Sequence, residues 1–175
     1  MNERKHDLII GRFQPLHLGH FNVIKNMTNP VIAVIRGNKT SNDKNRNPIP
    51  EQYQEQLIRY VFPDVPIIMI LGEGYIPSII NTAIEKGFAI QRVFAGADRI
   101  NDYKRQVSQA NERVLTNKST FPLISVDFVV SDRFTSASTV RDVIRNNDID
   151  TFRTLMPLEL SEEYVFRRLR TLINT

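Results

Sequence analysis

The stretch LIIGRFQPLHLGHFNVIKNM, residues 8–27, decides how the rest of the chain is interpreted. It begins with an apolar run, Leu8 to Ile10, that predicts a buried strand, and Gly11 marks the end of that strand. A short polar loop with two histidines, His17 and His20, leads into a helix predicted to begin near Gly19. A strand that runs through a loop into a helix N-terminus is a geometry that binds phosphate, because the first turn leaves backbone N–H groups unpaired.

Length and composition limit the class of protein. A chain of 175 residues with 41% hydrophobic and 24% charged residues predicts one globular domain over residues 1–175. The net charge of +4 suits an anionic ligand but is too small to predict nucleic-acid binding. There is no cysteine, which excludes disulfides and thiolate metal sites. No apolar run reaches membrane-spanning length and residues 1–7 are polar, so we expect a cytoplasmic protein with no membrane partner.

Apolar runs alternate with amphipathic stretches along the whole chain. Strands are predicted at residues 8–10, 31–35, 65–71, 92–95 and 123–130, and helices at about 19–27, from 51, 77–86, 99–118, 138–147 and from 161. Residues 38–50 carry turn-forming residues without an apolar period and predict a long loop. The alternation predicts an α/β fold, a single Rossmann-like doubly wound parallel sheet of about five strands, with flanking helices and a C-terminal helix.

Ligands of such sheets bind at the carboxyl ends of the strands, near the point where strand order reverses. The loops 11–20, 36–40 and 96–99 and the helix start at 136–141 are therefore predicted to share one rim. Two common phosphate motifs are missing, since there is no GxGxxG after the first strand and residues 37–40 (GNKT) lack P-loop order. Neither a dinucleotide-dependent oxidoreductase nor a P-loop ATPase is favoured.

The sequence resembles the nucleotidylyltransferase superfamily at two motifs. GRFQPLHLGH (11–20) matches the G-x-F-x-P-x-H-x-G-H signature and is most similar to nicotinamide mononucleotide (NMN) adenylyltransferases of archaeal and phage type. TSASTVR (135–141) is similar to ISxTxxR, with Ser136 and Arg141 in place, but Thr135 and Ser138 stand where Ile and Thr are usual. AGADRI (95–100) is similar to the G-x-D segment that contacts the nucleotide in relatives.

The resemblance implies an enzyme that transfers a nucleotidyl group from ATP to a phosphorylated acceptor, with NMN as first choice. The implied catalytic residues are His17, His20 and Arg141. The implied nucleotide-binding residues are Gly11, Arg12, Phe13, Gln14, Gly19, Lys39, Gly96, Asp98, Ser136 and Ser138. Magnesium would be carried by the triphosphate, without a metal site in the protein.

Several alternatives stay open. Two departures from the family pattern leave the acceptor open: Gln54 stands where many relatives have an arginine, and no tryptophan follows Asp98. Phe13, Tyr75, Phe94 or Phe134 could stack an acceptor ring instead. Cytidylyl transfer to an alcohol phosphate, adenylyl transfer to flavin mononucleotide (FMN) or phosphopantetheine, and a silent nucleotide-binding or assembly protein are the other candidates. Ser136, Ser138 and Thr139 could simply cap a helix. A homo-oligomer is not excluded.

Overall fold

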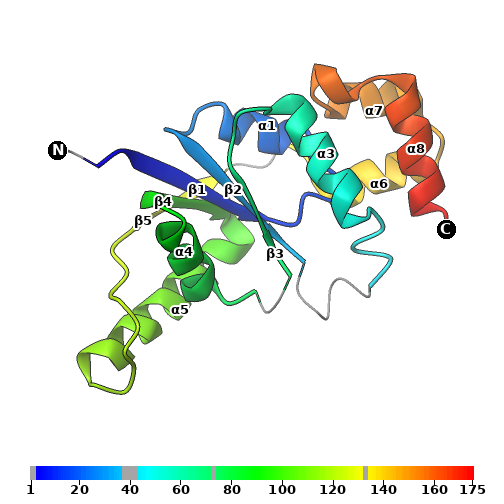
Figure 1. The fold of residues 1–175 in the computed structure, drawn as a ribbon. Coiled ribbons are helices and arrows are strands. Elements are labelled where there is room, and N and C mark those ends of the chain that lie inside the picture. The colour runs from blue at the N-terminus through cyan, green and yellow to red at the C-terminus, as the bar shows by residue number, and fades with distance from the viewer. Residues whose placement is uncertain (1–2, 37–42, 72–73, 132–133) are drawn as a thin grey trace.

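The computed structural model describes residues 3–36, 43–71, 74–131 and 134–175. Helices and strands alternate along the chain as far as residue 131, and the described remainder forms helices (Figure 1). The elements are β1 (Lys5–Gly11), α1 (Leu18–Ile24), β2 (Pro30–Ile35), α3 (Glu51–Val61), β3 (Ile67–Ile70), α4 (Ile76–Glu85), β4 (Ala89–Gly96), α5 (Ala97–Leu115), β5 (Asp127–Ser131), α6 (Ala137–Arg145), α7 (Ile149–Leu155), the short 3₁₀ helix η1 (Leu158–Leu160) and α8 (Glu163–Ile173).

The strands form one parallel sheet in the order β3-β2-β1-β4-β5. The chain builds outward from β1 to β3 and then returns to place β4 on the other side of β1. The carboxyl ends of β1 and β4 therefore flank the point where the strand order reverses. The predicted α/β Rossmann-like class is confirmed.

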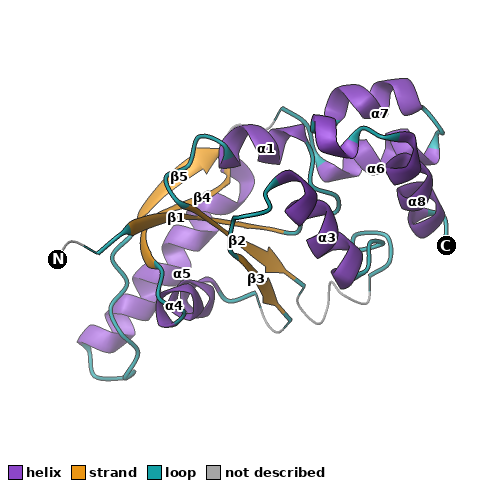
Figure 2. Cartoon of the chain, turned by 45° about the horizontal axis from the view of Figure 1, so that its top comes forward, coloured by secondary structure: helices purple, strands orange, loops and turns teal. Residues whose placement is uncertain are grey.

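Helices cover both faces of the sheet (Figure 2). Alternate residues of β1 face opposite sides: Leu8 and Ile10 pack with α4 and α5, and Ile9 packs with α1, α3 and the C-terminal helices. The sheet therefore has a hydrophobic core on each face. The core that contains Ile9 also contains Phe13 and Leu16 from the loop after β1 and the buried apolar residues of α8, so it joins that loop to α8. The C-terminal helices thus support the loop that carries the histidines.

Some predicted boundaries were wrong. Met27 is buried, but it lies in a turn beyond the end of α1. The strand predicted at 123–130 begins only at Asp127, because the side chain of Asn111 bonds the backbone N–H and C=O of Ile124 at 2.8 and 2.9 Å. The strand predicted at 92–95 is longer and begins at Ala89. The helix α7, which was not predicted, occupies the segment before α8.

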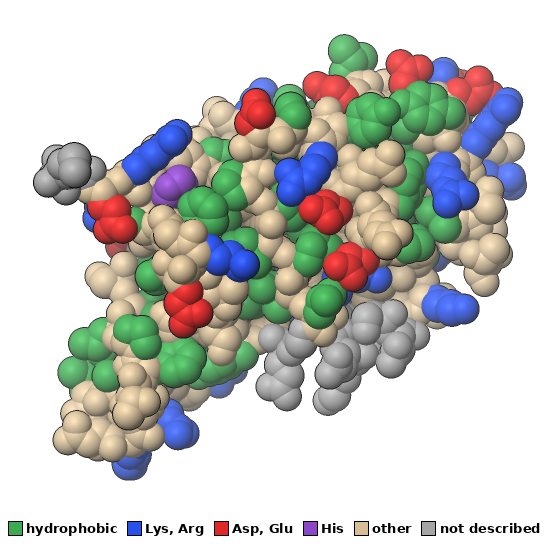
Figure 3. Space-filling view, in the orientation of Figure 1, with side chains coloured by type: hydrophobic (Ala, Val, Ile, Leu, Met, Phe, Trp, Pro, Cys, Tyr) green, Lys and Arg blue, Asp and Glu red, His purple; other side chains and the backbone are tan. Residues whose placement is uncertain are grey.

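Apolar side chains gather on the surface where α5 ends and the chain turns back, at the lower left of Figure 3. Leu115, Phe121 and Leu123 are all exposed there. Among the described helices, none is long and apolar enough to cross a membrane.

Candidate active site

A cavity of about 760 Å³ opens at the carboxyl ends of β1, β2, β4 and β5. This volume is typical of pockets that hold small organic ligands. Its walls include nearly all the residues predicted from the sequence: Gly11, Arg12, Phe13, Gln14, His17, Gly19, His20, Gly96, Asp98, Ser136, Ser138 and Arg141. Lys39 lies outside the described residues.

The two histidines form the N-terminal cap of α1. His17 is the N-cap residue, and its Nδ1 accepts a hydrogen bond of 3.0 Å from the backbone N–H of Gly19. The Nδ1 of His20 accepts a hydrogen bond of 3.2 Å from the backbone N–H of His17, which completes a reciprocal capping box. The two rings stack with centroids 3.8 Å apart. Because both Nδ1 atoms are acceptors, each neutral ring carries its proton on Nε2 and can donate there.

Phe13 holds an unusual backbone conformation beside His20. Its φ of 50° lies in the left-handed region, which costs a non-glycine residue about 1–3 kcal/mol and persists only where surrounding contacts hold it. The side chain of Gln54 supplies that support: its Nε2 donates to the carbonyl of Phe13 at 2.9 Å and to the carbonyl of Arg12. The buried Phe13 ring lies 4.5 Å from the His20 ring, so Gln54 helps to fix the position of the histidine.

Gln14 pairs with the backbone of a residue far along the chain. Its Nε2 donates to the carbonyl of Ile49 at 3.1 Å, and its Oε1 accepts from the Ile49 N–H at 2.9 Å. The buried guanidinium of Arg36 joins the same network, donating to the Ile49 carbonyl at 3.0 Å and to Gln54 Oε1 at 2.8 Å. Burial lowers the pKa of Arg36. This geometry gives the side chain of Gln14 a structural role in the loop, and because Gln14 also lines the cavity its predicted contact with a nucleotide stays a prediction.

The start of α6 brings hydroxyl groups to the cavity. Ser136 is the N-cap and accepts a hydrogen bond of 3.1 Å from the N–H of Thr139. Its Oγ also lies 3.0 Å from the Oγ of Ser138 and 2.8 Å from the Oγ1 of Thr139. The capping alternative is therefore correct for Ser136. Capping leaves the remaining N–H groups and the positive end of the helix dipole facing the cavity.

Arg141, one turn further along α6, connects that helix to the loop after β1. Its Nη1 donates to the carbonyl of Gln14 at 2.8 Å, and its buried Nε has no hydrogen-bond partner among the described residues. Burial lowers the pKa of Arg141, and the charges of Arg145 and Arg12 lower it further. An arginine stays protonated through such shifts, so Arg141 places a fixed cation on this wall.

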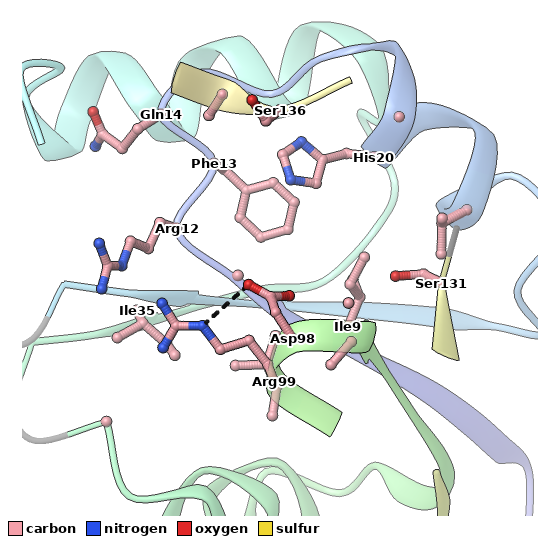
Figure 4. A pocket seen from close by; sticks show the side chains of 18 of the residues that line it. Ile9, Arg12, Phe13, Gln14, His20, Ile35, Asp98, Arg99, Ser131 and Ser136 are labelled. Carbon is pink, nitrogen blue, oxygen red and sulfur yellow. Dashed lines mark ion pairs between the residues drawn. The ribbon is translucent and has the colours of Figure 1, made fainter. Parts of the chain in front are cut away.

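Further cations enter the cavity near the end of β1 and the start of α5 (Figure 4). Arg12 forms no ion pair with any residue that the structure describes. Its pKa is lowered first by burial and then by the nearby charges of Arg99 and Arg46. Among the described residues, the ion pairs of Arg99 and Arg46 are long and exposed, at 3.9 Å with Asp98 and 3.7 Å with Asp43. The arrangement makes the cavity attractive to anions.

Several lining residues were not identified from the sequence. They are Arg46, Arg99, Asp102, Tyr103, Gln106 and Ser131. Positions 99, 102, 103 and 106 follow the spacing of one helical face, a signal that could have indicated a wall formed by α5 once position 98 was placed at the rim. Gln106 connects this face of α5 to the start of α4, since its Nε2 donates to Asp102 at 2.8 Å and its Oε1 accepts from the N–H of Ile76 at 3.0 Å.

The aromatic residues proposed for stacking differ in where they lie. Phe13 lines the cavity, and so does Tyr103, which was not considered. Phe94 packs against the core, with the guanidinium of Arg92 5.3 Å from its ring. Tyr75 and Phe134 have exposed side chains.

No family model matches this chain. No curated protein matches it either. Among solved structures it is similar to Thermotoga maritima TmcAL, crystallised with alpha-thio ATP, with a TM-score of 0.55 and 12% sequence identity. The match covers 97% of this chain and 56% of TmcAL, so the chain spans about half the length of that protein. At 12% identity the similarity supports the fold alone, and the chemistry depends on the residues of the site.

Proposed function

We propose that the chain is a nucleotidylyltransferase that transfers AMP from ATP to NMN and releases pyrophosphate. The observation that carries the proposal is the convergence of His17 and His20 with Ser136 and Arg141 in one cavity. These four residues come from the starts of two helices far apart in the sequence. The solved TmcAL complex contains an ATP analogue, which supports a nucleotide as ligand for this fold.

In the proposed reaction a phosphate oxygen of the acceptor attacks the α-phosphorus of ATP. The new P–O bond forms as the bond to the bridging oxygen breaks, and pyrophosphate leaves with that electron pair. Such a transfer depends on positioning and charge stabilisation, with no covalent intermediate on the protein. The product with NMN is NAD.

The side chains have separate roles in this scheme. His17 and His20 would donate from Nε2 to oxygens on the α-phosphorus, since Nδ1 of each ring is already an acceptor. The start of α6 and Arg141 would hold the β- and γ-phosphates, where the charge of the leaving group develops. Magnesium would be carried by the triphosphate, and Asp98 and Asp102 are the carboxylates that line the cavity and could bind its water shell.

A pyrophosphate-release screen of ATP and CTP against NMN, FMN, phosphopantetheine and alcohol phosphates tests the assignment. We expect NAD and pyrophosphate from ATP with NMN. Product from CTP, or from another acceptor, would replace NMN adenylyl transfer with one of the other transferases. If no pair of nucleotide and acceptor releases pyrophosphate although the nucleotide binds, the result would favour a binding or assembly protein.

Substitution of His20 tests the mechanism. We expect His20→Ala to abolish pyrophosphate release, because it removes a donor to the α-phosphate and half of the capping box. The matched control is His6→Ala at the start of β1, where the ring bonds the carbonyl of Asn29 at 2.9 Å. Turnover in His20→Ala equal to that of His6→Ala would remove the proposed mechanism.

A further inference from the structure

A second group of cationic and polar side chains lies in the same cavity, apart from the histidines and the start of α6. Arg12 follows β1, and Arg99 and Tyr103 lie on the first two turns of α5. Each of the three is an electrostatic neighbour of the other two. Arg46, from the loop before α3, also acts on Arg12 and lines the rim.

Tyr103 is the most informative member of this group. Its side chain is 6% exposed and lines the cavity, yet it forms no hydrogen bond with any residue that the structure describes. The phenol therefore brings a hydrogen-bond donor to the cavity wall beside Arg12 and Arg99, where a ligand oxygen could accept from it. Burial raises the pKa of Tyr103, which keeps the hydroxyl protonated and able to donate.

The arginines of this group are available to a ligand. Arg12 has no ion pair among the described residues, and the exposed pair between Arg99 and Asp98 is 3.9 Å long. An exposed pair of this length is weak, whereas an arginine that meets a phosphate forms short charge-assisted hydrogen bonds. Replacement of the weak Arg99–Asp98 pair by hydrogen bonds from Arg99 to a phosphate therefore favours phosphate binding.

The side chain of Gln54, which contacts the loop after β1, is not available to bind a phosphate. Its amide is committed to the backbone of Arg12 and Phe13 and to Arg36, so it shapes the loop. A transfer between two phosphate-bearing substrates needs a cation for each of them, because two phosphates repel one another as they approach. Arg12 is an electrostatic neighbour of Arg141 as well as of Arg99, so the two groups adjoin one another.

We propose that Arg12, Arg99 and Tyr103, with Arg46 at the rim, form a second anion subsite that binds the phosphomonoester of the acceptor. The inference rests on the proposed function for the identity of the ligand. The subsite itself is a statement about where a phosphate group binds. Its ligand is a phosphate dianion attached to a small organic group that fits the remaining cavity.

The test uses inorganic phosphate as the probe. The 175-residue chain, labelled with ¹⁵N, is first saturated with α,β-methylene ATP, and phosphate is then titrated while the arginine Nε–H signals are followed. We expect saturable binding that shifts the signals of Arg12 and Arg99.

We expect Arg99→Gln to weaken phosphate binding about tenfold and Tyr103→Phe about threefold, since the first removes a charged donor and the second a neutral one. Lys104→Gln, an equal loss of charge at the neighbouring exposed position, should leave the affinity within about twofold.

Each result decides the proposal. Phosphate that fails to bind beside the ATP analogue, with Arg99→Gln weakening the analogue instead, would assign these residues to the triphosphate and overturn the acceptor subsite. Equal phosphate affinities in all variants would also overturn it. Failure of the proposed function is seen separately, as no pyrophosphate release from any acceptor, while the titration still reports whether the subsite exists.

Discussion

Gly19 is the residue whose size is most tightly limited by the site. A Cβ built there would lie 2.8 Å from Cε1 and 2.9 Å from Nδ1 of His17, closer than such atoms approach. Alanine would normally stabilise a helix relative to glycine, by about 0.5–1 kcal/mol, but here it would push the capping histidine aside.

We expect Gly19→Ala to lower pyrophosphate release by about tenfold or more and to destabilise the fold by about 1–3 kcal/mol. Asn22→Ala on the same helix is the control. Turnover assays combined with urea unfolding measure both quantities. A Gly19→Ala protein with parental turnover and stability would show that the His17 cap is not constrained as described.

Gln54 controls the loop through its amide nitrogen. Gln54→Glu keeps the shape and the partner Arg36, but it replaces the donor to the carbonyls of Arg12 and Phe13 with a carboxylate that repels them. We expect turnover to fall about tenfold or more, with a loss of stability under about 2 kcal/mol because the new carboxylate pairs with Arg36. The exposed Gln56→Glu on the same helix should change neither. Equal turnover in the two variants would contradict a positioning role for Gln54.

At this scale the sequence identifies residues better than it identifies their partners. His17 and His20 could be predicted from a local motif, and they do line the cavity. Their mutual cap depends on the ring orientations, which no spacing reveals. Gln14 belongs to the same motif, but its partner Ile49 lies beyond a long loop, so its structural role could not be read from a local pattern.

At the scale of the element, the N-terminus of α6 combines a cap with a predicted phosphate site. Ser136→Ala removes the bond to the N–H of Thr139 and should cost about 0.5–2 kcal/mol of stability. We also expect weaker binding of α,β-methylene ATP by calorimetry. Asp148→Ala is the matched control, since Asp148 caps α7 by accepting a hydrogen bond of 3.1 Å from the N–H of Thr151. Similar stability losses with equal nucleotide affinities would limit Ser136 to capping.

Most of the helices and strands could be predicted from apolar runs and from the glycine, proline and other turn-forming residues that separate them. The misses have tertiary causes. The short helix α7 is stabilised by burial of Phe152, whose ring lies 5.0 Å from that of Phe166 on α8, and not by a long periodic pattern. The start of β5 is delayed because Asn111 occupies the backbone of Ile124.

At the scale of the whole molecule, an ion pair between the buried carboxylate of Asp7 and the partly exposed guanidinium of Arg92 joins β1 to β4 near their amino ends. Asp7 on β1 is fully buried and accepts hydrogen bonds from Arg92 Nε at 2.9 Å, Gln91 at 3.0 Å and the N–H of Thr28 at 2.7 Å. Burial alone raises the pKa of Asp7, but these hydrogen bonds outweigh it and lower the pKa below its ordinary value of 3.8. The stability that this carboxylate contributes is therefore present above about pH 3.8 and is lost as the pH falls through the lower, folded-state pKa.

We expect Asp7→Asn to lower the free energy of unfolding at pH 7 by about 1–3 kcal/mol and to flatten its decline in acid, because the buried carboxylate no longer titrates. Urea unfolding between pH 2 and pH 7 measures this, with the exposed Asp64→Asn as control. Turnover of the folded protein should be unchanged, since Asp7 lies at the end of β1 opposite the cavity. An acid dependence identical to that of the parent would contradict the assignment.

The fold class could be predicted because alternation of strand and helix is typical of a doubly wound parallel sheet, and the place of the cavity follows from the strand order that the structure shows. Arg12 and Arg99 lie in two loops that were predicted to share the rim, but the convergence of Arg46 and Tyr103 with them could not be predicted. These residues come from three segments whose side chains meet only after the sheet has formed.

The central claim is that one triphosphate lies between the paired histidines and the start of α6. A crystal structure of the protein with α,β-methylene ATP tests it most directly. We predict that the α-phosphate lies within about 3 Å of the Nε2 atoms of His17 and His20, with the β- and γ-phosphates on Arg141 and the first turn of α6. A nucleotide bound elsewhere, or a triphosphate that contacts only one of these two walls, would contradict it.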